Sequence, residues 1–168
     1  MGKKGQIQGQ PFIYIFIIIV SVLIITFGVK VLLDVINLGC KVEISTMIDK
    51  IEKSIESCYD LDKGSTCYFE DVSVCSDLTE LCFINLDESV NVNAVKDDIT
   101  RVIINNSVTF QEGFNLFLVP KEGKQLDKRK FKIRFTKVDE NPLCEDLTDG
   151  KLNLILYNDG NNVRIRRE

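Results

Sequence analysis

The sequence contains no histidine, and this absence removes several classes of function. Nucleophilic catalysis by a Ser-His or Cys-His pair needs an imidazole base, so neither kind of pair can form. A mixed Cys/His zinc site is excluded for the same reason. The chain also lacks a P-loop, a GxGxxG segment and a GxSxG segment, which mark nucleotide sites and serine hydrolases. We therefore expect a protein that is not an enzyme and that uses no cofactor.

No cysteine occurs before residue 40, and no two cysteines lie close together in the sequence. The six are Cys40, Cys58, Cys67, Cys75, Cys82 and Cys144, with smallest spacings of seven and eight residues. Zinc sites use pairs of the C-x₂₋₄-C kind, so we predict no metal site. An even number of cysteines on one side of an apolar segment is typical of disulfides formed in an oxidising compartment.

No charged residue occurs from Pro11 to Val29, where the sequence reads PFIYIFIIIVSVLIITFGV. As a helix, this run is about 28 Å long, close to the hydrocarbon thickness of a bilayer. Apolar residues continue to Leu33, and Lys30 can extend its ammonium group to the headgroups. A buried core helix is the alternative, but such helices are seldom apolar on all sides. We predict a transmembrane helix over residues 11–33, which is retained because no small-x-small cleavage site follows it.

The basic residues near this segment predict its orientation. Lys3 and Lys4 precede it, whereas on the other flank Lys30 is offset by Asp34. The positive-inside rule places residues 1–10 in the cytoplasm and everything after residue 34 outside the cell membrane. The part of the chain beyond residue 34, which is predicted to lie outside, has 18 of the 21 basic and 24 of the 25 acidic residues. Its net charge is therefore −6. That charge argues against nucleic acid or anionic lipid as a partner.

Residues 34–59 are predicted to continue the helix in amphipathic form. Apolar residues recur at steps of four and three, at Cys40, Ile44, Met47, Ile51, Ile55 and Cys58. This is the apolar stripe of a helix with one buried face. The turn-forming segment Asp60–Ser65 then ends the helix.

The helical spacing also restricts the disulfide pairing. Cys40 and Cys58 are five turns apart, about 27 Å, whereas a disulfide needs Cα atoms within about 7 Å. They therefore cannot bond to each other, and each must pair with one of Cys67, Cys75, Cys82 and Cys144. Because Cys144 is the one cysteine in the C-terminal half, its bridge is expected to close a long loop.

Beyond residue 64 the apolar period shifts toward two, which indicates strands. Strands are predicted at Ser65–Glu70 and Glu80–Leu86, on either side of a turn at Cys75, and a helix is predicted over Ala94–Asn105. A hairpin of Ser107–Phe110 with Phe114–Val119 and a strand at Lys130–Thr136 are expected to follow. The last strand contains Leu152, Leu154 and Leu156, and a turn at Asn158–Asn162 connects it to a strand at Val163–Arg166. The C-terminal basic residues are Arg164, Arg166 and Arg167. The first two alternate with Val163 and Ile165, which favours the solvent face of an edge strand over a binding patch.

These patterns predict an α+β fold. A long N-terminal helix, transmembrane and then amphipathic, packs on a small, mostly antiparallel sheet with one wet face, and disulfides stabilise the assembly. The head domain is expected to comprise residues 60–168 and to be extracytoplasmic.

Two acidic segments and one possible glycosylation sequence each have an ordinary and a functional interpretation. The acidic segments Asp60-Leu-Asp62 and Glu145–Gly150 lack EF-hand spacing, so we interpret them as turns rather than calcium sites. Asn105-Asn106-Ser107 is an N-x-S acceptor sequence, which makes Asn105 a candidate glycosylation site.

The segment Lys3-Lys4-Gly5-Gln6, directly before the apolar helix, resembles the class III-type signal segment of archaeal type IV pilin-like proteins. In that family a membrane peptidase cuts after the glycine on the cytoplasmic side, and the retained helix serves first as an anchor and later as the filament core. The resemblance covers the N-terminal region only. It implies that Gly5 precedes the cut and that Gln6 begins the mature chain. Alternatively, Lys3 and Lys4 are ordinary topogenic charges.

Two functions remain open from the sequence. The first is a structural subunit of a cell-envelope filament or pseudopilus. Its expected partners are the lipid bilayer, copies of itself or other pilin-like subunits, and the signal-processing peptidase. The second is a non-assembling, single-span membrane protein whose disulfide-bonded head binds an envelope partner or an extracellular ligand.

Overall fold

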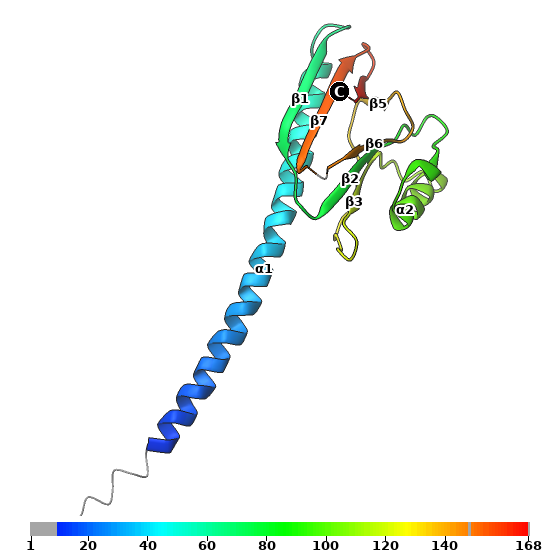
Figure 1. Cartoon of the computed structure of the whole chain (residues 1–168). Helices are drawn as coiled ribbons and strands as arrows, with labels where there is room; N and C mark the ends of the chain where they lie inside the picture. The colour runs from blue at the N-terminus through cyan, green and yellow to red at the C-terminus, as the bar shows by residue number, and fades with distance from the viewer. Residues whose placement is uncertain (1–9, 148, 168) are drawn as a thin grey trace, which may run out of the picture. The chain divides into compact units, whose positions relative to one another are not determined.

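The computed structural model describes residues 10–147 and 149–167 and confirms the α+β fold class (Figure 1). The elements are α1 (Gln10–Tyr59), β1 (Thr66–Ser73), β2 (Leu78–Phe83), η1 (Val92–Ala94), α2 (Asp98–Thr109), β3 (Leu116–Pro120), β4 (Lys130–Phe131), β5 (Thr136–Val138), β6 (Leu143–Asp146), β7 (Lys151–Asn158) and β8 (Val163–Arg166). Contacts divide the chain into two compact units, one ending at Lys41 and the other comprising Val42–Glu168. Residues 42–59 thus group with the predicted head domain.

The C-terminal part of α1 contributes to the core of the second unit. Its buried apolar residues there are Ile44, Met47, Ile48, Ile51, Ile55 and Cys58. The helix ends at Tyr59, where the carbonyl groups of the last turn have no partner within the helix. Asn158 supplies one, because its Nδ2 donates to the carbonyl oxygens of Cys58, Tyr59 and Leu61 at 3.1, 2.9 and 2.8 Å. A side chain from β7 therefore caps the helix.

The first sheet has the order β1-β7-β8-β5. Figure 1 shows β1 beside β7, with which it pairs antiparallel. The predicted turn at Asn158–Asn162 is confirmed, since β7 and β8 form an antiparallel pair with Asn158 opposite Val163. The prediction of β8 as an edge strand is wrong, because its other side pairs in parallel with β5.

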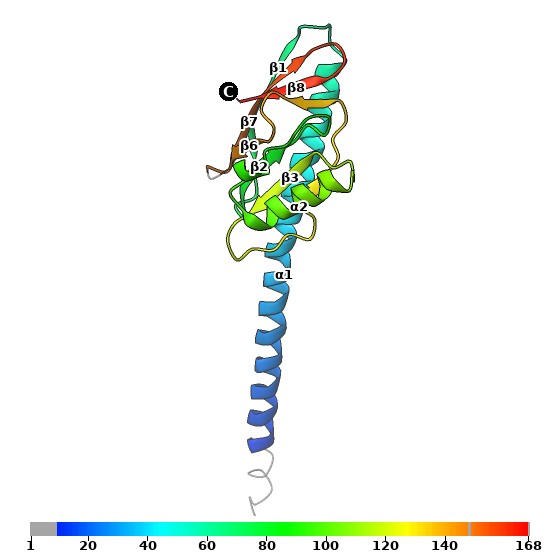
Figure 2. The ribbon, with the colours of Figure 1, turned by 90° about the vertical axis from the view of Figure 1, so that its right-hand side faces the viewer.

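The second sheet has the order β4-β3-β2-β6 and is antiparallel throughout. The helix α2 lies against β3 on one face of it, as Figure 2 shows. Between them is a buried cluster made of Cys82, Ile84, Val95, Ile104, Phe117 and Val119. The expectation of one sheet is thus wrong, because β1 pairs with β7 whereas its successor β2 pairs with β3 and β6.

The predicted helix at Ala94–Asn105 and the predicted strand at Ser107–Phe110 are both corrected by α2. The helix begins at Asp98 because the Asp97 side chain accepts a hydrogen bond from the Thr100 backbone N–H, which is a helix N-cap. It runs through Ser107 to Thr109, so no hairpin strand forms there. Only the second strand of the predicted hairpin exists, as β3.

The predicted strand at Lys130–Thr136 is divided into β4 and β5. Phe135, between them, has a φ of 60°, a left-handed conformation that breaks a strand. Its ring stacks on Tyr59 with centroids 4.2 Å apart, and Arg134 forms an ion pair with Glu56 of α1. Contacts to the end of α1 thus override the alternating pattern.

Candidate membrane anchor and disulfide-bonded head

The segment Pro11–Leu33 of α1 is long and apolar enough to cross a membrane, with 23 residues and a mean hydropathy of 3.0. None of its most apolar window is buried within the protein. The hydroxyl group of Thr26 donates to the Val22 carbonyl oxygen at 2.7 Å, so the helix itself satisfies this polar group. These properties are compatible with membrane anchoring.

The predicted processing site cannot be placed on this helix. Gly5 and Gln6, together with Lys3 and Lys4, lie outside the described residues. The cut after Gly5 and the orientation of the segment therefore stay predictions.

The cysteines form disulfides, as predicted. Cys58 bonds Cys67 and ties the end of α1 to β1, with Cα atoms 6.0 Å apart. Cys82 bonds Cys144 and links the paired strands β2 and β6 across 62 residues of sequence. Cys40 and Cys75 are also disulfide-bonded. Cys58 thus does not pair with Cys40, and Cys144 does close a long loop. These bonds suggest an oxidising, extracellular environment.

The three C-terminal arginines are matched by acidic side chains. Arg164 contacts Asp139 at 3.1 Å and Asp159 at 3.2 Å, and these hydrogen bonds raise the pKa of its guanidinium group. Arg166 pairs with the same Asp139 at 2.5 Å, and Arg167 pairs with Glu145 at 2.9 Å. These ion pairs join β8 and the residue after it to neighbouring loops and strands.

Asp159, in the turn between β7 and β8, has a second role. Backbone N–H groups of Asn161 and Asn162 donate to its Oδ1 at 2.9 and 2.7 Å. These bonds, and then its contact with Arg164, lower the pKa of the Asp159 carboxyl group. The ionised side chain thus organises the turn.

The other predicted positions lie at the surface of the head. Asp149 Oδ1 accepts from the Lys151 N–H at 3.1 Å, which is a turn contact. The candidate glycosylation site Asn105 is exposed on α2, but Ser107 of the same acceptor sequence is 0% exposed. A glycosylating enzyme that must bind the side chains of both Asn105 and Ser107 can reach Ser107 only before α2 has packed.

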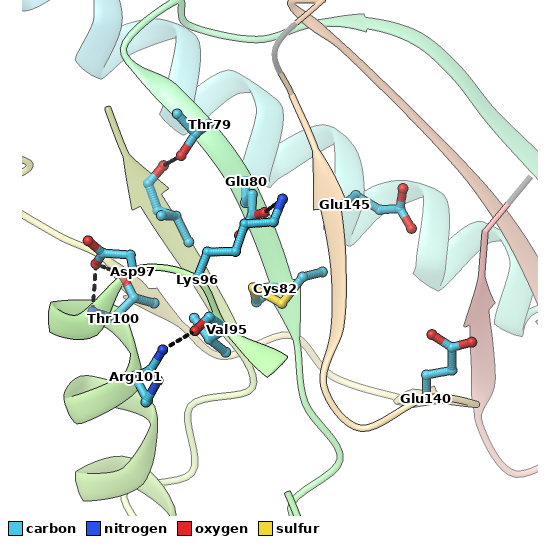
Figure 3. The surroundings of a disulfide bond; sticks show 12 residues. Thr79, Glu80, Cys82, Val95, Lys96, Asp97, Thr100, Arg101, Glu140 and Glu145 are labelled. Carbon is cyan, nitrogen blue, oxygen red and sulfur yellow. Dashed lines mark hydrogen bonds and ion pairs between the residues drawn. A yellow bond between two sulfur atoms is a disulfide. The ribbon is translucent and has the colours of Figure 1, made fainter. Parts of the chain in front are cut away.

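The structure also brings together two charged residues, Glu80 and Lys96, whose proximity the sequence did not reveal. Figure 3 shows Lys96 close to Glu80, beside the disulfide of Cys82. The two form a salt bridge of 2.6 Å, although 16 positions separate them in the sequence, and Glu80 is buried. The hydrogen bond with Glu80 raises the pKa of the Lys96 ammonium group. Neither residue belongs to a recognised motif, and no sequence signal identified them.

No protein-family model, curated protein or solved structure matches this chain.

Proposed function

We propose that the chain is a membrane-anchored structural subunit of a cell-envelope filament or pseudopilus, a pilin-like protein of an archaeal cell. The observation that supports this most is the composition of α1. Its segment Pro11–Leu33 is apolar and exposed, whereas its C-terminal part supplies buried residues to the disulfide-bonded unit. A transmembrane and then amphipathic helix is the element that a subunit of this kind needs.

The exposed apolar surface of the anchor suits two environments. Large side chains such as Phe12, Phe16, Ile24 and Phe27 are exposed along the segment. In a bilayer, lipid chains would cover them. In a filament, the same side chains would pack against equivalent helices of other copies, where close packing replaces lipid contacts. The proposal therefore needs no change in α1 between anchored and assembled subunits.

The proposed topology has a cytoplasmic N-terminus and an extracytoplasmic head. It is supported by the basic residues before the span and by the disulfides beyond it. A membrane peptidase would cut after Gly5 on the cytoplasmic side and leave Gln6 as the first residue.

The test is the mass of the mature chain, measured by intact mass spectrometry of native membranes and of sheared surface material. We expect a chain that begins at Gln6 and is present in both fractions. Gly5→Leu should prevent processing and remove the chain from the sheared fraction. Gly2→Leu, the same change outside the cut site, should leave both results unchanged. A full-length native chain confined to membranes would contradict the proposal.

The charged group at Glu80 and Lys96 favours the second candidate, a single-span protein whose head binds a ligand or an envelope partner. This candidate predicts an unprocessed, membrane-confined chain. The same mass measurements therefore distinguish the two functions.

A further inference from the structure

A cleft of about 410 Å³ lies on the surface of the second unit, at the edge strand β6. Its lining residues come from four separate segments of the chain and are Glu80, Ala94, Lys96, Cys144, Glu145, Asp146 and Arg167. All of them belong to the unit Val42–Glu168. The volume lies in the lower part of the range for small-molecule sites.

Glu80, on β2, is an unusual residue for such a cleft because it is only 6% exposed. Its Oε1 contacts the Lys96 ammonium group at 2.6 Å. Its Oε2 is buried and accepts no hydrogen bond from the residues that the structure describes. Leaving a buried acceptor without a donor lowers stability, and more so for a charged group. A ligand that donates to this oxygen would recover that stability.

The partner of Glu80 is held loosely. The Lys96 side chain is 77% exposed, so it reaches the carboxylate from the solvent and can turn away without disrupting the core. Arg167 is held more firmly, since it donates to the Glu145 carboxylate and to the Cys144 carbonyl oxygen, each at 2.9 Å. Lys96 is therefore the cation that a ligand could replace.

The surroundings favour a positive charge at that place. Glu80 and then Asp146 raise the pKa of the Lys96 ammonium group, which shows that their field stabilises a cation there. A single metal ion fits less well. Within the described part of the chain, the three carboxylates of the cleft do not bring their oxygens within 4.8 Å of one another. An ammonium group needs no such convergence, because it forms separate hydrogen bonds to separate acceptors.

We propose that this cleft binds a primary ammonium group, which displaces Lys96 from Glu80 and donates to the buried Oε2. The natural occupant of the site, the Lys96 ammonium, has the same chemistry as the ligand. The ligand is either a free small amine or a lysine side chain on a peptide. This inference does not depend on the proposed filament function.

The test uses the full chain in detergent micelles, with the Glu80 side-chain carboxyl carbon followed by NMR. The probes are Nα-acetyl-lysine amide, its Nε-acetylated analogue and n-butylamine. We expect saturable shifts from Nα-acetyl-lysine amide and none from the acetylated analogue, which lacks the ammonium group. Equal affinity for n-butylamine would identify a free-amine site, and much weaker binding of it would identify a peptide site.

Three variants sharpen the result, with binding followed on the neighbouring β6 amides. Glu80→Gln should weaken binding about tenfold or more, because the charged acceptor is lost. Lys96→Met should tighten binding several-fold, because the competing ammonium is removed while the apolar stem is kept. Glu122→Gln, the same charge change on an exposed loop, should have no effect. If Glu80→Gln fails to fold, Lys96→Met decides alone. Unchanged or weaker binding to Lys96→Met, or equal binding of the acetylated analogue, would overturn the proposal.

Discussion

The two parts of α1 on either side of residue 41 differ in where their apolar side chains lie. In Pro11–Leu33 nearly every side chain is apolar and exposed, and Ile24 is 67% exposed. In the part after Val42, the apolar residues recur at helical spacing and are buried in the unit, and Ile51 is 1% exposed. Charged residues such as Lys50 and Glu52 occupy exposed or partly exposed positions between them.

The two parts of this one helix are therefore suited to different surroundings. The first part has no polar face, so water is a poor environment for it and lipid or other helices are a good one. The second part has an apolar stripe that its own unit covers. Each part is thus expected to respond to substitution in a different assay, membrane retention for the first and unfolding of the head for the second.

The largest effect is expected from the disulfide between β2 and β6. The double variant Cys82→Ala/Cys144→Ala should lose about 4 kcal/mol of unfolding free energy, because the bond closes a separation of 62 residues. Cys58→Ala/Cys67→Ala should lose less unfolding free energy, about 3 kcal/mol, because its disulfide closes a shorter separation of 9 residues. Urea unfolding in detergent, followed by tyrosine circular dichroism, measures both. The chain should stay in the membrane fraction, and its release would contradict the independence of anchor and head.

The same substitution in both parts of α1 tests the comparison directly. Ile51→Ala should destabilise the head by about 3 kcal/mol, since it leaves a cavity in a packed core. Ile24→Ala removes the same atoms from an exposed position and should leave head unfolding unchanged. Urea unfolding of the two variants in identical micelles provides the measurement. Equal losses would mean that Ile24 is also packed against the protein.

A smaller effect is expected at the C-terminal end of α1. Asn158→Ala removes the donor to the carbonyl oxygens of Cys58, Tyr59 and Leu61, and should cost about 2 kcal/mol. Hydrogen exchange should speed up in the last turn of α1. The control is Asn161→Ala, an exposed asparagine in the same turn. Unchanged exchange in Asn158→Ala would show that the cap contributes little.

The smallest effect concerns pH. The pKa of Asp159 is lowered in the folded head, so its ionised form adds stability at neutral pH. That contribution is complete above the ordinary pKa of aspartate and is lost as the pH falls through the lower, folded value. Asp159→Asn should therefore be slightly less stable than the parent at pH 7. The difference should begin to shrink only as the pH falls below about 4, and it should vanish below the lowered pKa of the folded state. Urea midpoints across this range test it, and a constant difference would argue against the role of the charge.

Local signals in the sequence were sufficient for some elements. The end of α1, the strand β7 and the turn into β8 follow from periodicity and turn residues, and the apolar segment follows from its composition. Predictions failed where distant contacts decide the conformation. Phe135 leaves the strand pattern because it stacks on Tyr59, which is 76 positions earlier in the sequence.

The same limit explains the missed cleft and the second sheet. Glu80 looked like an ordinary polar residue of a strand, because its burial depends on neighbours from β6 and from the segment before α2. The sequence pattern favours a strand at Ser107, whereas the structure continues α2 through it, because this helix depends on the cap at its other end and on packing against β3. Strand partners of this kind are not encoded within a short window.

The interior position of β8 sets an order of events during biogenesis. In the part of the chain that the structure describes, β5 has hydrogen-bonded strand contacts with β8 alone, and β8 also pairs with β7. Because synthesis proceeds from the N-terminus, β5 is available to the folding head before β8 has been made. Until residues 163–166 have been synthesised, β5 lacks the strand with which it pairs, and one side of β7 has no hydrogen-bonded neighbour. The first sheet therefore closes late, and a chain whose synthesis has stalled before β8 would expose an unpaired strand edge to chaperones, proteases or another copy of the chain.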